Sequence, residues 1–378
     1  MDLFIKFLKE ISKNNIHLIK PLKKSNITQN PVIFWYSKVP NLKEYRYIYL
    51  WKLYKQKVKL EQINKRIKLN KEKLWEQRYK ILLDEIKYIY KKIDFLKNVY
   101  DFEANKIDPK YKISYPEMDY DYFNRAFFWV KKSDICKDTY IEDTDEKYTN
   151  VSKADLKELL ELSKKIIPWL NYKFWSYAFM SHGSGTLVIP TKKYYTSREL
   201  VTLFFHEMTH FFRRYNNIAN YQTTHWFSDY MKLEEWFALY NEYYYWKKLL
   251  PNIKYNPFYD ACYCVLLNNK LNKTQKQEKI YKILKVKWFS REKSLHYYYR
   301  FYRYSSFKTD QYFLKDLIYT KWYKRVNRLL KQNKKNYDLI FSGRVWPRML
   351  KTDLCITQNN FDTKTYFDTM LAEIQKKI

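Results

Sequence analysis

The chain has 378 residues, of which 46% are hydrophobic, which is enough to fill the core of one large or two ordinary domains. Its formal net charge is +32, and clustered Lys and Arg are typical of proteins that release counterions from phosphate. Lys, Asn, Ile and Tyr are enriched along the whole sequence, however, while Gly, Pro and Ala are scarce. This bias indicates an AT-rich genome rather than one basic patch, so a basic helical nucleic-acid-binding protein is the less favoured alternative.

The sequence predicts a cytoplasmic protein with no membrane partner. No run reaches the roughly 18 apolar residues that a membrane span requires. Lys6, Lys9 and Lys13 interrupt the apolar residues at the N-terminus, so no signal-peptide core forms there. The four cysteines show no paired metal-ligand spacing and are expected to be buried thiols in a reducing compartment: Cys136, Cys262, Cys264 and Cys355.

In chain order, residues 1–40 look like a basic, poorly patterned lead, with membrane anchoring through a basic amphipathic first helix as a less favoured alternative. From Leu42 to about Tyr100, apolar residues recur at helical spacing and predict one or two long helices with a solvated outer face. A helix is expected over 152–167. The short, β-branched run from Gly185 to Pro190 predicts a strand, and Ser197 begins the next helix.

That helix carries His206-Glu207-Met208-Thr209-His210, an HExxH motif. Residues four apart lie one turn above each other, so His206 and His210 can share a zinc ion while Glu207 takes a proton from water. With six histidines in the chain, the pattern would arise by accident in roughly one such chain in a few hundred, so it needs a third ligand. The apolar side chains around the motif are expected to form core rather than substrate pocket: Phe204, Phe205, Met208, Phe211 and Phe212.

The third ligand is expected about 25 residues downstream, at Glu234 or Glu235. Catalytic zinc takes three protein ligands and leaves one position open, and two histidines with a glutamate are one common set. Adjacent residues on a helix point in different directions, so only one of the pair can face the metal. We favour Glu235; the bland alternative is that both are solvated helix glutamates.

Seven short segments, in the same order, resemble the microtubule-associated tyrosine carboxypeptidase family and its bacterial QEGLA-motif relatives. They lie at 185–190, 195–200, His206 to Arg213, Glu234 to Glu242, 300–303, 315–319 and Phe341 to Arg344. The family's Glu-Glu-Gly-Leu-Ala falls on 234–238, which makes Glu235 the matching zinc ligand. The resemblance implies a gluzincin-type metallopeptidase, which needs Zn2+.

Two departures from the family stand out. The family spaces its histidines as His-Glu-x-x-x-His, one residue wider than here. Tryptophan also stands at Trp236 and Trp322 where the family has glycine, in a chain with three glycines and twelve tryptophans. Since some bacterial codes read UGA as glycine, we hypothesise that some of these tryptophans are translated UGA codons. UGG at position 236 or 322 in the gene would exclude the idea there.

The expected fold is α+β and predominantly helical: a zincin-like catalytic domain over 106–350 with a small sheet and an HExxH active-site helix. A basic helical N-terminal extension precedes it over 1–105, and a C-terminal tail or helix follows over 351–378. The expected activity is removal of a C-terminal residue from a protein or peptide, with a zinc endopeptidase or aminopeptidase on the same scaffold as the alternative. Glu207 would act as general base and Tyr319 would donate to the oxyanion, while Arg300, Arg303 or Lys315 would hold the substrate carboxylate.

Overall fold

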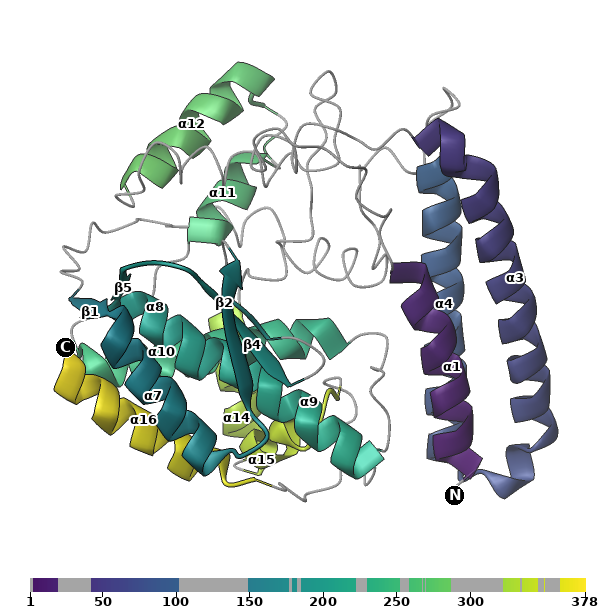
Figure 1. Cartoon of the computed structure of the whole chain (residues 1–378). Coiled ribbons are helices and arrows are strands. Elements are labelled where there is room, and N and C mark those ends of the chain that lie inside the picture. Colours follow the sequence, from purple (N-terminus) through teal and green to yellow (C-terminus); the bar gives the residue numbers. More distant parts are fainter. Residues whose placement is uncertain are drawn as a thin grey trace. The chain divides into compact units, whose positions relative to one another are not determined.

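The computed structural model is predominantly helical with two small sheets, which confirms the expected α+β class (Figure 1). It describes residues 3–19, 42–101, 149–176, 179–181, 185–221, 230–251, 258–266, 268, 270–286, 322–333, 335–345, 350 and 361–378. Internal contacts divide the chain into two units, 1–143 with 257–320 and 144–256 with 321–378. The boundaries expected at 105 and 350 stay predictions. Within the described ranges, no helix is long and apolar enough to cross a membrane.

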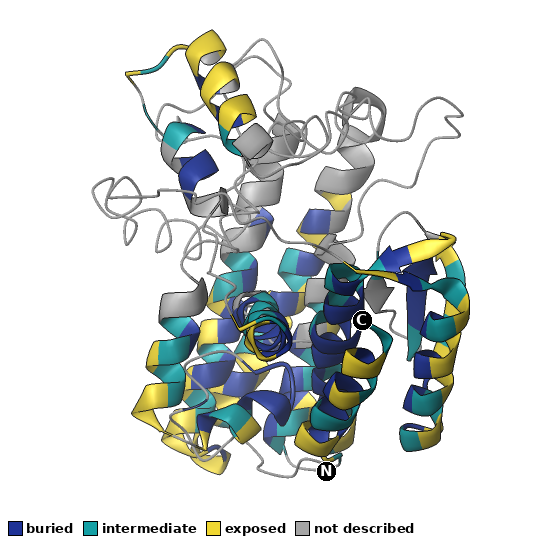
Figure 2. Cartoon of the chain, turned by 90° about the vertical axis from the view of Figure 1, so that its left-hand side faces the viewer, coloured by how far each residue is buried: buried dark blue, intermediate teal, exposed yellow. Residues whose placement is uncertain are grey.

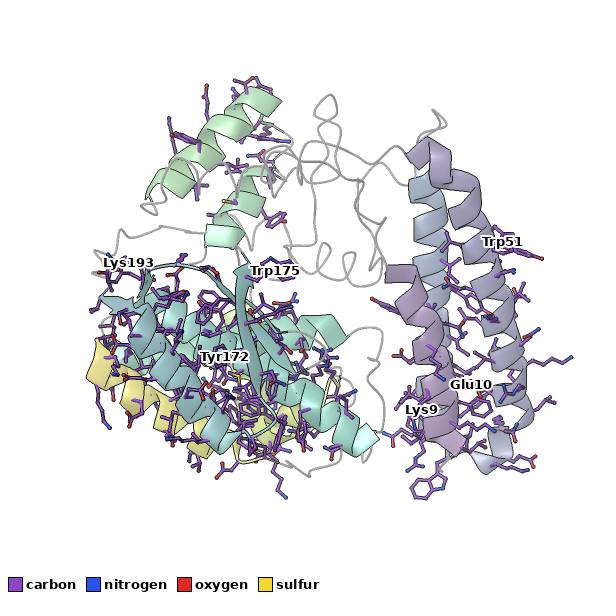
Figure 3. The ribbon with its side chains drawn as sticks, in the orientation of Figure 1. Lys9, Glu10, Trp51, Tyr172, Trp175 and Lys193 are labelled. Carbon is purple, nitrogen blue, oxygen red and sulfur yellow. The ribbon has the colours of Figure 1, made fainter. Side chains whose placement is uncertain are left out.

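In the first unit, α1 (Leu3–Ile19), α3 (Leu42–Leu69) and α4 (Glu76–Asp101) pack on one another, with a short 3-10 turn, η1 (Lys71–Lys73), between α3 and α4. The two long helices were expected, and the six apolar positions that carry the helical spacing in this stretch are all buried: Leu74, Ile81, Leu82, Ile86, Ile89 and Ile93. The outer side of α3 is solvated, and Trp51 projects from it with the ammonium of Lys55 3.7 Å from the ring centroid (Figure 3). The other described helices here, α11 (Phe258–Leu266) and α12 (Lys273–Val286), contact each other.

The start of the chain is more regular than expected. Within the lead that we took to be poorly patterned, α1 buries Phe4, Phe7, Leu8 and Ile11, which recur at the spacing of one helix face. Glu10 accepts two hydrogen bonds from Arg66 of α3, at 2.9 and 3.1 Å. These four apolar side chains of α1 are therefore covered by protein, and the membrane-anchor alternative stays a prediction.

The second unit holds both small sheets. Strand β4 (Thr186–Pro190), the strand expected from sequence, lies between β2 (Asn171–Ser176), which runs parallel to it, and β3 (Met180–Ser181), which runs antiparallel. Separately, β1 (Asn150–Ser152) pairs antiparallel with β5 (Tyr194–Thr196). Gly185 enters β4 with φ +75°, a left-handed conformation that favours glycine.

The described helices of this unit are α7 (Lys153–Ile166), α8 (Ser197–Val201), α9 (Met208–Tyr221), α10 (Tyr230–Leu249), α14 (Trp322–Gln332), α15 (Asn336–Phe341) and α16 (Thr363–Lys377). Of these, α7, α8 and α9 contact the strands. Helix α8 begins at Ser197, as expected, and Thr196 with Glu199 forms a capping box before it. A π-helical turn, η5 (Thr202–Glu207), joins α8 to α9. It packs on α10 and α16, and the inward faces of these helices are buried (Figure 2).

The apolar residues around the HExxH motif are core, as the sequence predicted. Phe204, Phe205 and Met208 are fully buried, and Phe211 and Phe212 are nearly so. The ring of Phe205 stacks on Tyr245 of α10 at 4.4 Å between centroids. Apolar packing therefore fixes the η5–α9 segment against α10, and this holds the polar side chains between them at set distances.

Candidate metal centre

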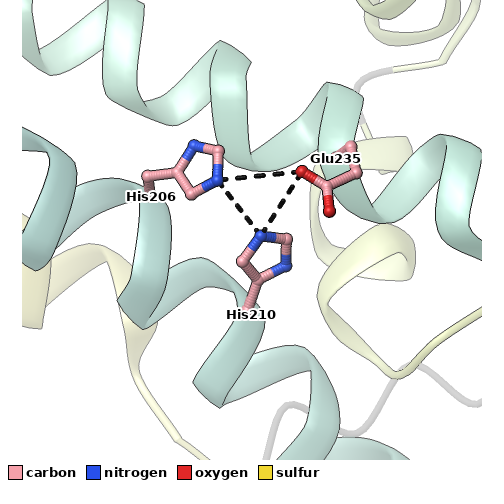
Figure 4. A group of neighbouring side chains, drawn as sticks. All are labelled: His206, His210 and Glu235. Carbon is pink, nitrogen blue, oxygen red and sulfur yellow. Dashed lines mark hydrogen bonds and ion pairs between the residues drawn. The ribbon is translucent and has the colours of Figure 1, made fainter. Parts of the chain in front are cut away.

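His206, on η5, and His210, on α9, point their Nε2 atoms toward each other at 3.2 Å, as Figure 4 shows together with Glu235 of α10. The Glu235 Oε2 atom lies 3.8 Å from each of the two Nε2 atoms. Among the described residues, this trio forms a group whose ligand atoms all lie within 4.8 Å of one another. The three side chains that the sequence proposed as ligands therefore converge.

These distances fit one shared ion. Zinc holds histidine nitrogen at about 2.0–2.1 Å and carboxylate oxygen at about 2.0–2.2 Å, so two tetrahedral ligand atoms lie about 3.3 Å apart. The nitrogen pair at 3.2 Å matches that separation, and the two contacts of Glu235 need a shift of a few tenths of an ångström. Three protein atoms would leave a fourth position open.

Each histidine has a carboxylate on its other ring nitrogen. His206 Nδ1 lies 2.9 Å from Glu242 Oε2, and His210 Nδ1 lies 3.0 Å from Glu234 Oε1. An ionised carboxylate only accepts, so both Nδ1 atoms carry the hydrogen. In the neutral rings the two facing Nε2 atoms then hold lone pairs, and such atoms repel at 3.2 Å unless a cation or a proton lies between them.

Glu242 is held in place by three residues of the α8–η5 segment. Its Oε1 atom contacts Arg198 at 2.7 Å and accepts a hydrogen bond from the Thr202 hydroxyl at 3.2 Å. Its Oε2 atom accepts a hydrogen bond from His206 Nδ1. The three contacting residues are spaced four apart, at positions 198, 202 and 206. An α-helix of 3.6 residues per turn would rotate such a series steadily off one face, and the wider π turn between Thr202 and Glu207 offsets that rotation.

Glu234 lies between two buried arginines. Arg213 of α9 contacts Glu234 Oε2 at 2.9 Å, and Arg344, which follows α15, donates to Oε1 at 3.1 Å. The Arg213 side chain is fully buried and also donates to the carbonyls of Ile340 and Gly343, at 3.0 and 3.1 Å. The partner of His210 is thus tied to the 340–345 segment as well as to α9.

The electrostatics of the centre favour positive charge at His206. Burial opposes its protonation, but the hydrogen bond and charge of Glu242, with smaller contributions from Glu207 and Glu235, outweigh it and raise the pKa of His206 to about 9. Burial alone would raise the pKa of both supporting carboxylates. Arg344 and Arg213 instead lower the pKa of Glu234 to about 2, and Arg198 lowers that of Glu242 to about 2. Both carboxylates are therefore ionised at neutral pH.

Glu207 adjoins this group without belonging to it. The residue is 9% exposed, and its charge contributes to the raised pKa of His206. This placement, near the histidines but outside the converging trio, suits a base better than a ligand.

Several expected residues lie outside the described ranges. The three candidate carboxylate-binding residues and the candidate oxyanion donor are in this class: Arg300, Arg303, Lys315 and Tyr319. The alternative of two solvated glutamates is wrong, because Glu234 is 3% exposed and Glu235 faces the histidines.

Sequence reasoning missed the supporting role of Glu234 and Glu242. A signal was present, because Glu234 directly precedes the expected ligand and Glu242 shares one helix face with Glu235. Trp236, where the resembling family has glycine, is buried, with the Arg325 guanidinium 4.8 Å from its ring centroid.

Comparison of the chain with known protein families, with curated proteins and with solved structures finds no match. The resemblance to the tyrosine carboxypeptidase family therefore rests on short motifs.

Proposed function

We propose that the chain is a zinc-dependent metallopeptidase with a zincin-like catalytic domain. The observation that carries the proposal is the convergence of His206 Nε2, His210 Nε2 and Glu235 Oε2 at separations of 3.2 to 3.8 Å, beside Glu207. Two nitrogens and one carboxylate oxygen with an open fourth position are typical of catalytic zinc. Nδ1 contacts to carboxylates on both histidines add the supporting shell that metal-ligating histidines normally have.

When bound at such a site, zinc polarises the scissile carbonyl and acidifies water. The residues of the chain supply the rest. Glu207 accepts a proton from the attacking water and returns it to the leaving amine, as a general base and then a general acid. His206 and His210 would hold the ion as neutral rings, each donating a hydrogen bond from its Nδ1 atom, to Glu242 and to Glu234 respectively.

Within this class we favour a carboxypeptidase acting on a peptide or protein C-terminus. Support comes from the motif resemblance, which brings Arg300, Arg303 and Lys315 as candidates for the substrate carboxylate and Tyr319 as an oxyanion donor. An arginine fork matches a carboxylate in geometry and charge. An endopeptidase or aminopeptidase would use the same metal centre, so end labelling of the cleaved peptides distinguishes the three activities.

The test is a peptide library incubated with zinc-loaded protein and followed by mass spectrometry, for the wild type and Glu207→Gln. Glutamine keeps the size of the side chain and cannot accept a proton, so zinc should stay bound while turnover falls by about 10²–10⁴-fold. Metal analysis that includes iron identifies the bound ion, because two histidines and a carboxylate also hold iron. Stoichiometric zinc with wild-type turnover in Glu207→Gln would exclude the proposed mechanism.

A further inference from the structure

We propose that Glu242 and Glu234 are positioning residues that hold His206 and His210 with their Nε2 atoms turned toward one shared metal ion. The inference rests on the proposed function and extends it to two residues outside the converging trio. A histidine ring can expose either nitrogen, and it can rotate about its side-chain torsions. An acceptor fixed at Nδ1 removes both freedoms.

The acceptor for His206 is fixed by the helix that carries His206. Arg198 and Thr202 hold Glu242 Oε1 at 2.7 and 3.2 Å, which leaves Oε2 for His206 Nδ1 at 2.9 Å. Because the π turn η5 keeps residues 198, 202 and 206 on one face, a single carboxylate from α10 reaches all three. The geometry of His206 therefore depends on the register between α10 and the α8–η5 segment.

The acceptor for His210 is fixed by α9, which also carries His210, and by the 340–345 segment. Arg213 holds Glu234 Oε2 at 2.9 Å, and Arg344 shares Oε1 with His210, at 3.1 and 3.0 Å respectively. Two adjacent residues of α10 thus contact opposite sides of the His210 ring: Glu235 lies by its Nε2 atom, and Glu234 accepts a hydrogen bond from its Nδ1 atom.

Glu242 offers the cleaner test, because its arginine partner can tolerate the loss. The Arg198 side chain is 39% exposed and can be hydrated once Glu242 is removed, whereas Arg213 is fully buried and would be left as a buried charge without Glu234. Glu242→Gln keeps an oxygen that can accept from Nδ1, and Glu242→Ala removes it. Glu161→Gln is a matched control, because Glu161 also accepts a side-chain hydrogen bond, from the Tyr172 hydroxyl at 2.8 Å.

The first measurement is the zinc dissociation constant of the full chain, by competition with a chelator. Loss of such a partner typically weakens metal binding by about 10–100-fold, which we expect for Glu242→Ala. Glu242→Gln should recover most of that loss, to within about fivefold of the wild type, and Glu161→Gln should not differ from it. Glu242→Ala within about twofold of the wild type would overturn the inference.

The second measurement separates positioning from folding. A Co2+-substituted protein reports ligand geometry through its visible absorption, and the melting temperature of the metal-free protein reports stability. We expect Glu242→Ala to change the Co2+ spectrum and Glu242→Gln to restore it. If the Co2+ spectrum of Glu242→Ala is unchanged, and its zinc affinity falls only in proportion to its melting temperature, then Glu242 stabilises the fold and does not position His206. If the wild type binds no zinc, the proposed function itself fails and this inference falls with it.

Discussion

Replacing Arg213 by methionine should destabilise the second unit strongly, because Arg213 is a fully buried cation with several partners. Its guanidinium contacts Glu234 Oε2 at 2.9 Å and donates to the carbonyls of Ile340 and Gly343, at 3.0 and 3.1 Å. Methionine keeps much of the volume and none of these contacts. Removing one partner of a buried ion pair costs about 3–5 kcal/mol, since the remaining charge stays buried.

The assay is urea unfolding of the metal-free protein, together with its melting temperature. For a unit of about 150–250 residues, 1 kcal/mol shifts the melting temperature by about 2–4 °C, so Arg213→Met should lower it by about 6–20 °C. Lys248→Met is the control, because Lys248 forms an exposed ion pair with Asp368 at 3.2 Å, and it should cost under about 1 kcal/mol.

A double variant tests the cause of the loss. Arg213→Met should lose stability because the buried charge of Glu234 no longer has Arg213 beside it. Adding Glu234→Gln to Arg213→Met removes that charge and should recover part of the lost free energy of unfolding, with a coupling between the two substitutions of about 0.5–3 kcal/mol. A loss under about 1 kcal/mol in Arg213→Met would mean that the buried ion pair contributes no more to stability than a surface pair, contrary to this prediction.

Three further predictions concern the substrate and two local structures. A peptide with a free C-terminal carboxylate should be cleaved about 10–150-fold more efficiently than its amide, and equal cleavage in a paired turnover assay would exclude the carboxypeptidase while leaving a zinc peptidase. Asp362→Ala should cost about 0.5–2 kcal/mol in urea unfolding, because Asp362 caps α16 through the Thr365 amide. Hydrogen bonds from Thr365 lower the pKa of Asp362, so this contribution is present above the ordinary pKa and disappears as pH falls through the lowered one; no difference between the two proteins at neutral pH would contradict the capping role. Gly185→Ala should cost about 1–2 kcal/mol, because its φ of +75° is unfavourable for alanine, and a melting temperature equal to that of the wild type would count against this.

The local elements could be predicted from the sequence because their signals are local. Helical spacing gave the two long helices of the first unit, β-branched residues gave β4, and the motif spacing placed His206 and His210 on one face. The same spacing was present in α1, at Phe4, Phe7, Leu8 and Ile11, but interspersed lysines obscured it.

The rest depends on packing between segments that are distant in sequence. Glu234 and Glu242 lie 24 and 36 residues from the histidines that they contact, so their roles appear only once α10 is packed on η5 and α9. The parallel pairing of β2 with β4 likewise could not be predicted from a turn motif, because parallel strands are not joined by a tight hairpin turn. The π turn is an adjustment of helix register, and spacing rules based on 3.6 residues per turn do not contain it.

The codon hypothesis for tryptophan has its own direct test in the gene. Trp236 is 4% exposed and packs under Arg325, so a glycine there would leave space beside Glu235. UGA at codon 236, read as glycine by the source, would make Trp236→Gly the protein to assay. UGG would make tryptophan the native residue.

The central claim is tested most directly by anomalous scattering at the zinc absorption edge from crystals of the zinc-loaded full chain. We expect one strong peak in the second unit, from a zinc ion bonded to His206 Nε2, His210 Nε2 and Glu235 Oε2 at about 2.0–2.2 Å, with Glu207 nearby but not bonded. A zinc-loaded protein with no peak between the two histidines, or with Glu235 turned away from the peak, would exclude this three-residue zinc site.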